Sequence, residues 1–320
     1  MAIVSNAHEF NVDDLFIDLG FLTDYPLYLK CEGFNFAGSI KLKAALAMVE
    51  AAEREGRLTE GSVLVESSSG NLGVALSVIA AARGYRFACV ADSRSNDAAL
   101  AQMRSLGAEV HLVTEPDGER GLVGARIRYV QDLCKRDNRY VWLNQYGNHA
   151  NVAAHELTTA REIDEQFPEL DVLFVGAGTT GTLMGCARYF KQNYPRTAIV
   201  AVDSVGSTLF GTPPGRRLIP GVGNGIRPEI FDPSVVDDVV MVTEPETVRT
   251  CHRMAGRGFL FGGSTGTVVS GAMSWLSQHA EPEQTAVAIA PDLGLPYLKT
   301  IYQPDWVYEA YGMKIGSGHA

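Results

Sequence analysis

Lys41 is the residue of this 320-residue sequence whose setting most favours covalent chemistry. It stands just inside a predicted helix that begins near Ser39, between the apolar residues Ile40 and Leu42. Burial and the positive end of a helix dipole both disfavour an ammonium group, so we expect a lowered pKa for this lysine. A neutral lysine amine forms Schiff bases with carbonyl compounds. Taken alone, however, the stretch is better explained by two solvated surface lysines at positions 41 and 43.

Three glycine- and hydroxyl-rich turns each follow a predicted strand or open a helix. They are ESSSGNLG (66–73), VGAGTTGTLMG (175–185) and FGGSTGTVVSG (261–271). Each offers backbone N–H groups at the start of a helix, where anions bind favourably, although simple capping by Ser or Thr is the alternative. The second turn also spells G-x-G-x-x-G and precedes a strand that reaches Asp203, as in a dinucleotide site. A dinucleotide site explains that turn and leaves the other two unexplained.

Helical and strand patterns alternate along most of the chain and must position these groups. Short strands alternating with helices of twelve or more residues predict an α/β fold with mostly parallel sheets flanked by helices. The predicted strands are 62–68, 86–92, 109–114, 171–178 and 198–204. The predicted helices are 38–56, 70–85, 96–108, 121–136, 155–167 and 182–194. The Gly- and Pro-rich stretch 207–228 breaks this rhythm, and it is either a functional loop or a surface excursion.

Composition narrows the class of protein. The chain is 46% apolar and 20% charged, and its length suits two domains. A net charge of −10 argues against a nucleic-acid or anionic membrane surface. No apolar run approaches the length of a membrane span, and no signal peptide is recognisable, so we expect a cytoplasmic protein. Five scattered cysteines and seven histidines show no ligand spacing, which predicts free thiols and no metal.

Six segments, in order, resemble the fold-type II pyridoxal-phosphate (PLP) enzymes of the cysteine synthase and cystathionine β-synthase family. The similarity runs from about residue 28 to 300. The family's G-S-x-K, S-G-N-x-G and QFxNPAN…HExTT segments match 38–41, 69–73 and 145–159. Its phosphate cup, G-G-S-x-G loop and closing P-x-x-G-x-x-Y-L match 178–182, 262–266 and 291–298.

The resemblance implies two domains, each a mostly parallel sheet flanked by helices. Residues 1–38 with 150–320 would form the large PLP-binding domain, and 39–149 the smaller substrate-carboxylate domain. Lys41 would hold PLP as a Schiff base and, once freed, take the α-proton of the substrate. The residues assigned to the cofactor are Lys41, Asn71, Gly178, Thr179, Thr180, Gly181, Thr182 and Ser264. Those assigned to the substrate carboxylate are Ser68, Ser69, Asn71 and Gln145.

Ser264 would face the pyridine nitrogen of the cofactor. A serine does not keep this nitrogen protonated as an aspartate does, which favours loss of a β-substituent over transamination. The implied course is elimination to an aminoacrylate and addition of a nucleophile. Two departures stand out: Leu42-Lys43 replaces the family's Asp-Arg, and its I-G-N-T-P-L segment is not recognisable upstream.

The chain most closely resembles the synthases of the 2,3-diaminopropionate pathway, which supply siderophore and antibiotic biosynthesis. These join O-phospho-L-serine to L-glutamate and give N-(2-amino-2-carboxyethyl)-L-glutamate. Arg126 and Tyr146 stand where those enzymes have an arginine and a tyrosine. We expect Arg126 to bind the phosphate of phosphoserine, because a guanidinium suits that anion, although a solvated helix-surface arginine is the alternative.

Several other functions remain open at this stage. Within the family, the alternative is a cysteine synthase that uses O-acetylserine or O-phosphoserine with sulfide or thiosulfate. An NAD-dependent oxidoreductase would rest on residues 171–203 alone. A non-catalytic regulatory paralogue is a further alternative, but both Lys41 and the Ser264 loop are retained. The expected partners are small amino-acid substrates and a second copy of the chain in a homodimer.

Overall fold

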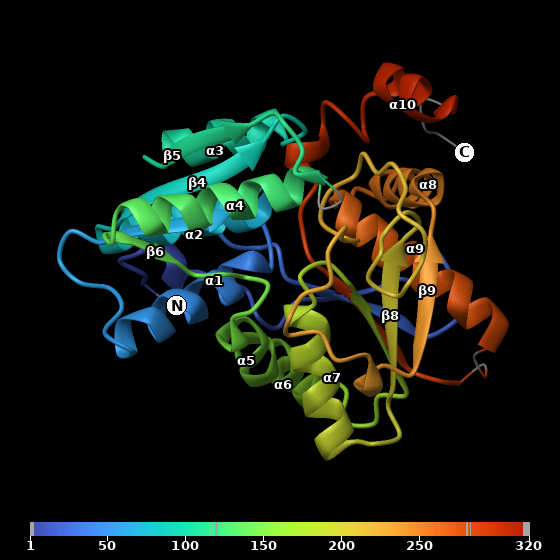
Figure 1. Cartoon of the computed structure of the whole chain (residues 1–320). Helices are drawn as coiled ribbons and strands as arrows, with labels where there is room; N and C mark the ends of the chain where they lie inside the picture. The colour runs from blue at the N-terminus through green and yellow to red at the C-terminus, as the bar shows by residue number, and fades with distance from the viewer. Residues whose placement is uncertain (1–2, 119–120, 280, 282, 316–320) are drawn as a thin grey trace.

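Two sheets, each flanked by helices, form the computed structural model of this protein, which describes residues 3–118, 121–279, 281 and 283–315. Figure 1 shows the smaller sheet with α2, α3 and α4 on one side of the molecule, and β8 and β9 with α7, α8 and α9 on the other. The chain is therefore an α/β protein with two sheet-based units, as the sequence predicts. No described helix is both long and apolar enough to cross a bilayer.

The larger sheet has six strands in the order β1-β2-β10-β7-β8-β9. Its strands are β1 (Phe16–Asp18), β2 (Leu27–Cys31), β7 (Val172–Gly176), β8 (Ala198–Ser204), β9 (Asp238–Val242) and β10 (Ala286–Ala290). Only the β1–β2 pair is antiparallel among them. Alternate residues of the same strands pack into two separate cores: Leu173 and Val175 against α7 (Gly181–Asn193), Val172 and Phe174 against α9 (Gly263–His279). This alternation buries both faces of the sheet.

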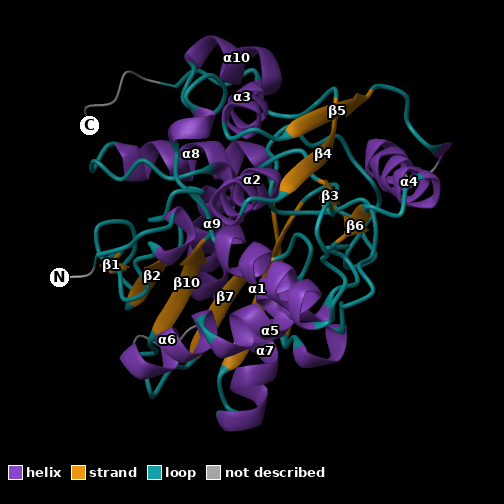
Figure 2. Cartoon of the chain, turned by 90° about the vertical axis from the view of Figure 1, so that its left-hand side faces the viewer, coloured by secondary structure: helices purple, strands orange, loops and turns teal. Residues whose placement is uncertain are grey.

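The smaller sheet has four parallel strands in the order β5-β4-β3-β6. They are β3 (Val63–Ser67), β4 (Arg86–Asp92), β5 (Glu109–Val113) and β6 (Tyr140–Trp142). Helices α1 (Lys41–Arg54), α2 (Asn71–Arg83) and α3 (Asp97–Ser105) share a core with one face, and α4 (Gly121–Arg136) covers the other. Figure 2 shows β3 to β6 gathered apart from β2, β10 and β7.

The path of the chain interleaves the two units. β1 and β2 start the larger sheet, the chain builds the smaller sheet between residues 63 and 142, and it then returns to the larger one. The remaining helices are α5 (His149–Leu157), α6 (Thr159–Gln166), α8 (Glu244–Ala255) and α10 (Pro304–Tyr311). All strands of the larger sheet lie in the predicted segments 1–38 and 150–320, and all strands of the smaller in 39–149. The domain limits themselves stay a prediction.

The predicted helix 155–167 is wrong as a single element. The structure ends α5 at Leu157 and starts α6 at Thr159, and Thr158 between them has a non-helical backbone (φ −123°, ψ −82°). The Thr158 hydroxyl donates to the Ala154 carbonyl, a local bond by which threonine competes with helix continuation. His155 therefore belongs to α5, which packs against α7.

A cluster of buried charges ties α1 to the larger sheet. Lys43 Nζ lies 2.9 Å from Glu32 Oε2 and 2.7 Å from Glu162 Oε2, and Lys30 Nζ lies 2.9 Å from Glu162 Oε2. Burial by itself would lower the pKa of Lys43, but Glu32 and Glu162 outweigh burial and raise it above its ordinary value. Lys43 thus stays charged and holds the first turn of α1 against β2 and α6. Lys43, which departs from the Asp-Arg pair of the resembling family, therefore has a structural role in this protein.

We expect Glu32→Gln to destabilise the fold by about 3–5 kcal/mol, because the buried ammonium groups of Lys30 and Lys43 then share Glu162, and only Lys43 has a second, half-exposed partner in Asp13. Urea denaturation at neutral pH measures this loss in the free energy of unfolding. Glu55→Gln is the matched control, because Glu55 forms an exposed pair with Arg57 and should change stability by less than about 1 kcal/mol. Equal effects of the two variants would contradict the importance of the buried cluster.

Candidate active site

The loops that carry the predicted site residues meet between the two sheets. Asn151 donates to Thr179 at 3.3 Å and to the Gln145 carbonyl at 2.9 Å, which joins two of the predicted segments. The Ile40 N–H donates to the Pro291 carbonyl at 2.8 Å and so ties the lysine segment to the closing segment. Four helix N-termini, those of α1, α2, α7 and α9, belong to these loops. The predicted residues are therefore brought together by the fold although they span most of the chain.

Lys41 is the first residue of α1 and lies between the buried side chains of Ile40 and Leu42. Burial lowers its pKa to about 8, and the carboxylate of Asp292 opposes this shift. A pKa near 8 leaves an appreciable fraction of neutral amine at physiological pH, which nucleophilic and general-base chemistry require. The geometry expected from the sequence, an apolar-flanked lysine at a helix start, is confirmed.

The turn from β7 to α7 forms a cup of backbone N–H groups. Within the described chain, none of the N–H groups of residues 178–183 has a hydrogen-bond acceptor. Thr180 adopts the left-handed conformation (φ 69°), and its buried Oγ1 also lacks a partner. A Cβ at Gly178 would lie 2.4 Å from the Gly221 carbonyl, and one at Gly181 would lie 2.1 Å from Asn151 Oδ1. Such a cup at a helix N-terminus fits a phosphate group, so the residues present suit PLP.

Ser264 lies in the first turn of α9, with its side chain buried. Its hydroxyl is 3.4 Å from the Pro220 carbonyl, and a Cβ at Gly221 would lie 2.0 Å from Ser264 Oγ. The Gly223 N–H donates to Ala177, and the Asn224 amide to Gly178. Part of the long 207–228 loop thus packs on both the phosphate cup and the serine turn, so it is not a mere surface excursion.

The serine-rich turn follows β3 and opens α2. Ser68 Oγ accepts from the N–H groups of Gly70 and Gly73, so this hydroxyl caps the turn. Ser69 and Asn71 are half-buried, and Asn71 begins α2. Gln145 is buried and donates its amide to the Ser67 carbonyl at 2.7 Å. Asn151 donates to the Gln145 carbonyl and to Thr179, which links this turn to the cup.

Arg126 is buried in α4, with 4% of its surface exposed. The alternative of a solvated arginine on the helix surface is therefore wrong. Its Nε lies 3.2 Å from Asp92 Oδ2 but is not aligned for a hydrogen bond. Neither terminal amino group of Arg126 has an acceptor among the described residues, which leaves these donors available to a ligand. Burial raises the pKa of the Tyr146 hydroxyl, and Arg126 opposes this, which places the two side chains near each other.

Three polar residues of the site received no role from the sequence, although all lie in segments quoted for the resemblance. Asn151 links Gln145 to Thr179, and Asp292 lies close to Lys41. His155 is fully buried between Thr159 Oγ1 and Thr182 Oγ1, each 3.2 Å away. Burial, with Lys41 and Lys43, lowers the pKa of His155 well below its usual range, so the ring is neutral. For Asn151 and His155, the signal available in the sequence was a polar side chain at a buried position of a helix.

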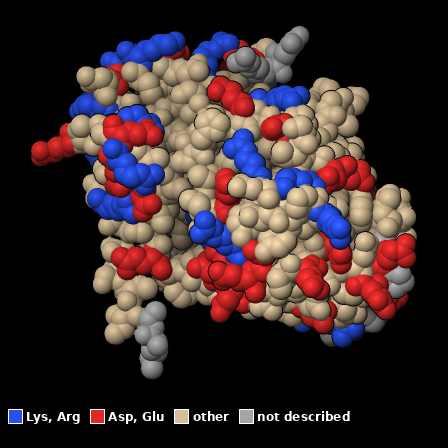
Figure 3. All heavy atoms as spheres, turned by 90° about the horizontal axis from the view of Figure 1, so that it is seen from below, with Lys and Arg blue, Asp and Glu red and all other residues tan. Residues whose placement is uncertain are grey.

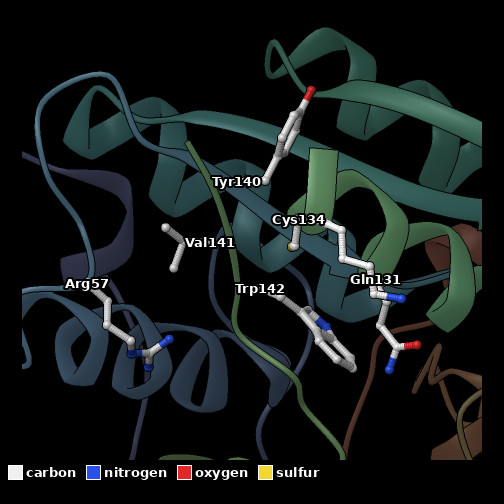
Figure 4. A pocket seen from close by; sticks show the side chains of 7 residues that line it. Arg57, Gln131, Cys134, Tyr140, Val141 and Trp142 are labelled. Carbon is white, nitrogen blue, oxygen red and sulfur yellow. The ribbon is translucent and has the colours of Figure 1, made fainter. Parts of the chain in front are cut away.

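An open cavity of about 640 Å³ lies elsewhere, on the outer side of the smaller sheet. Figure 4 shows Trp142, Cys134, Gln131 and Arg57 around it, and it contains none of the predicted site residues. The face seen in Figure 3 carries acidic and basic side chains interspersed, without a broad basic surface. The described residues contain no cluster of His, Cys, Asp or Glu suited to a metal ion.

Solved structures similar to this chain agree with this geometry. An O-ureido-L-serine synthase superposes with a TM-score of 0.88 at 29% identity, covering 99% of this chain and 98% of its own. A hydrogen sulfide-producing enzyme from Fusobacterium nucleatum gives 0.85 at 27%, covering 92% and 100%. An O-acetylserine dependent cystathionine β-synthase from Helicobacter pylori gives 0.87 at 25%, covering 95% and 100%.

The family comparison covers most of the sequence. Residues 17–292 match the family described as pyridoxal-phosphate dependent enzyme, a span that contains Lys41, the phosphate cup and Ser264. The cup of free N–H groups and the lysine of lowered pKa are the features that such a cofactor needs. The match over this span, together with that geometry, shows that this chain belongs to the family of pyridoxal-phosphate dependent enzymes.

Proposed function

We propose that this enzyme catalyses a β-replacement on O-phospho-L-serine, with the amine of L-glutamate as nucleophile. The product would be N-(2-amino-2-carboxyethyl)-L-glutamate, a precursor of 2,3-diaminopropionate for siderophore or antibiotic biosynthesis. The reaction class has the support of the similar solved structures, whose names refer to O-ureido-L-serine, O-acetylserine and hydrogen sulfide. The observation that carries the choice of phosphoserine is the buried guanidinium of Arg126, whose terminal donors have no acceptor among the residues that the structure describes.

Lys41 would hold the cofactor and act as the base. Bound PLP supplies an electron sink for the bond that breaks at Cα. Lys41 Nζ, neutral above a pKa of about 8, would accept the α-proton of the substrate. The N–H groups of 178–183 with the hydroxyls of Thr179, Thr180 and Thr182 would bind the cofactor phosphate. Neutral His155 would hold the Thr182 hydroxyl in place, since its ring contacts that oxygen.

The remaining side chains would orient the substrate. Ser68, Ser69, Asn71 and Gln145 would bind its α-carboxylate, which keeps the Cα–H bond towards Lys41. Arg126 and Tyr146 would bind the phosphate of phosphoserine and stabilise it as it leaves. Asp92 would hold Arg126 in that orientation through their 3.2 Å ion pair. Burial of the guanidinium strengthens its bond to a dianionic phosphate.

The acceptor side would be lined by residues 206–226. In this loop Arg217 is half-buried and donates to the Val222 carbonyl at 3.3 Å, whereas Arg216 is exposed. Burial lowers the pKa of Arg217, and Asp203 opposes the shift. We assign the side-chain carboxylate of glutamate to Arg217 rather than to Arg216, because a half-buried guanidinium loses less binding energy to water.

A cysteine synthase is the second candidate function. The specific observation in its favour is the similarity to the Helicobacter pylori enzyme, which is named for its dependence on O-acetylserine. Such an enzyme would need no arginine at position 126, since an acetate leaving group carries no phosphate charge. From the family resemblance we also expect a homodimer, which analytical ultracentrifugation would measure; the cytoplasmic location is an expectation from the sequence.

Arg126→Ala should raise KM for O-phosphoserine by at least about 30-fold, because a buried charge pair is lost, while the visible spectrum of bound PLP stays unchanged. Arg126→Lys keeps the charge but not the paired donors, so we expect an intermediate KM. Steady-state kinetics would compare the KM values of these variants. Arg128→Ala is the control, because Arg128 is an exposed arginine of the same helix. An unchanged KM in Arg126→Ala would contradict the assignment of Arg126 to the phosphate of phosphoserine.

The donor and the acceptor can be separated by spectrum and product. We expect the visible band of the purified protein to shift to longer wavelength with O-phosphoserine and not with O-acetylserine. Mass spectrometry should then find the glutamate adduct when L-glutamate is added, and no cysteine with sulfide. A shift with O-acetylserine alone, followed by cysteine formation, would replace the proposal with the cysteine synthase.

The rate should increase with pH because Lys41 accepts a proton only when neutral. Its pKa is about 8, so kcat should be low near pH 6, rise with a midpoint near pH 8 and level off above it. Buffers of constant ionic strength between pH 6 and 10 give the profile. A kcat that is flat, or that falls across this interval, would contradict Lys41 as the base.

A further inference from the structure

The pairing of β3 with β6 stops before the two segments that carry the expected carboxylate-binding residues. The parallel register between these strands ends with Val65 opposite Trp142. The serine-rich turn 67–71 and Gln145 both come after this last pair. Ligands of parallel sheets bind at this edge, outside the carboxyl ends of the strands. Beyond the last strand pair, side-chain hydrogen bonds join the two segments.

Glu66, the residue after Val65, supplies one of these bridges with its carboxylate. Its Oε2 accepts the Gln145 N–H at 3.1 Å, and its Oε1 accepts the Ser67 N–H at 2.8 Å and the Trp142 indole N–H at 3.0 Å. The side chain of Glu66 is fully buried. All three partners are donors that cannot accept, so an ionised carboxylate, which only accepts, fits this arrangement.

Gln145 supplies the second bridge. Its side-chain amide donates to the Ser67 carbonyl at 2.7 Å. A primary amide carries two N–H bonds, so one remains for a ligand. Asn144, directly before it, has a left-handed backbone (φ 55°), a conformation that persists only where neighbouring contacts hold it. The bond from the Gln145 N–H to Glu66 holds the main chain next to this strained residue, and with it the direction of the Gln145 amide.

The electrostatic surroundings of Glu66 contain one cation. Four ionisable side chains interact with its charge: Arg126 and Cys134 of α4, Cys89 of β4, and Tyr146. Burial raises the pKa of both thiols and of the phenol, so these three are neutral near pH 7. The ion pair that Arg126 forms among the described residues is with Asp92. Burial raises the pKa of Glu66 to about 7, while its three hydrogen bonds and Arg126 oppose the shift.

We propose that Glu66 is a positioning residue for the α-carboxylate of the substrate: its ionised carboxylate joins the Gln145 segment to the serine-rich turn, so that the donors of both segments face one ligand. The proposal rests on the proposed function only in assigning these two segments to the α-carboxylate. A protonated Glu66 would turn one acceptor oxygen into a donor that faces other donors. We therefore expect an amino acid to bind more weakly when Glu66 is protonated.

The test measures the Kd of L-alanine for the PLP-loaded enzyme by calorimetry, near pH 8.5 and near pH 6. L-Alanine has the α-amino and α-carboxyl groups of the substrate but no leaving group at Cβ. Glu66→Gln has the hydrogen-bonding pattern of the protonated acid, so we expect it to weaken binding by at least about tenfold near pH 8.5. Near pH 6, where wild-type Glu66 is itself protonated, the two Kd values should converge.

The convergence separates positioning from a general structural defect, which would weaken binding equally at both pH values. Glu60→Gln is the matched control, because Glu60 is an exposed acid shortly before β3 and should leave the Kd unchanged at both. A Kd that Glu66→Gln leaves unchanged near pH 8.5, or weakens equally at both pH values, would overturn the role of Glu66.

A second variant keeps the carboxylate and serves if Glu66→Gln does not retain PLP. Trp142→Phe removes one donor from Glu66 and leaves both main-chain donors. Loss of a hydrogen bond raises the pKa of a carboxylate, so the pH at which L-alanine binding weakens should rise by about one unit. Lys41 and the ligand amine titrate in both proteins, so the difference between them reports Glu66. An unmoved midpoint would overturn the proposal.

Failure of this proposal and failure of the proposed function give different results. Unchanged L-alanine binding in Glu66→Gln would overturn the role of Glu66 alone. Absence of L-alanine binding in the wild-type enzyme would contradict the amino-acid site itself, and with it the role of Glu66. The titration contains neither O-phosphoserine nor L-glutamate, so a failure of these two compounds to react would leave the measured Kd values interpretable.

Discussion

A lysine at the first position of a buried helix is the constraint around which this structure is organised. Burial disfavours a cation at Lys41, so its pKa falls to about 8. A group so placed is reactive because water does not stabilise its charge. The carboxylate of Asp292, which lies 251 residues later in the chain, opposes that shift.

A second lysine of the same helix is in a different electrostatic environment. Lys43, two residues after Lys41, forms ion pairs with Glu32 and Glu162 and stays charged. The contrast shows that exposure alone does not decide the state of a lysine, since both residues are only partly accessible. What decides it is the number and distance of carboxylates that the tertiary structure supplies. One lysine therefore fastens the helix to the sheet, and the other remains available for chemistry.

The anion-binding features follow the same logic with backbone groups in place of side chains. Parallel strands end at one edge of a sheet, and the helices that follow begin there, so their free N–H groups collect at that edge. At the β7–α7 turn, glycines allow the approach of the 221–224 segment and of Asn151, where any side chain would clash. Arg126 adds a full charge from the opposite unit, and its burial distinguishes it from Arg128 on the same helix. The region between the units therefore suits ligands that carry several negative charges.

The sequence by itself determined the alternation of strands and helices, the position of Lys41 at a helix start and the three glycine- and hydroxyl-rich turns, because these depend on local pattern and glycine content. The resemblance to the PLP enzymes also followed from short segments, and the family match bears it out. Only the tertiary structure decided that Arg126 is buried, that Thr158 breaks a helix, and that Asp292 lies between the lysine and serine loops. These properties depend on contacts between residues far apart in the chain, where neither periodicity nor residue type indicates a partner.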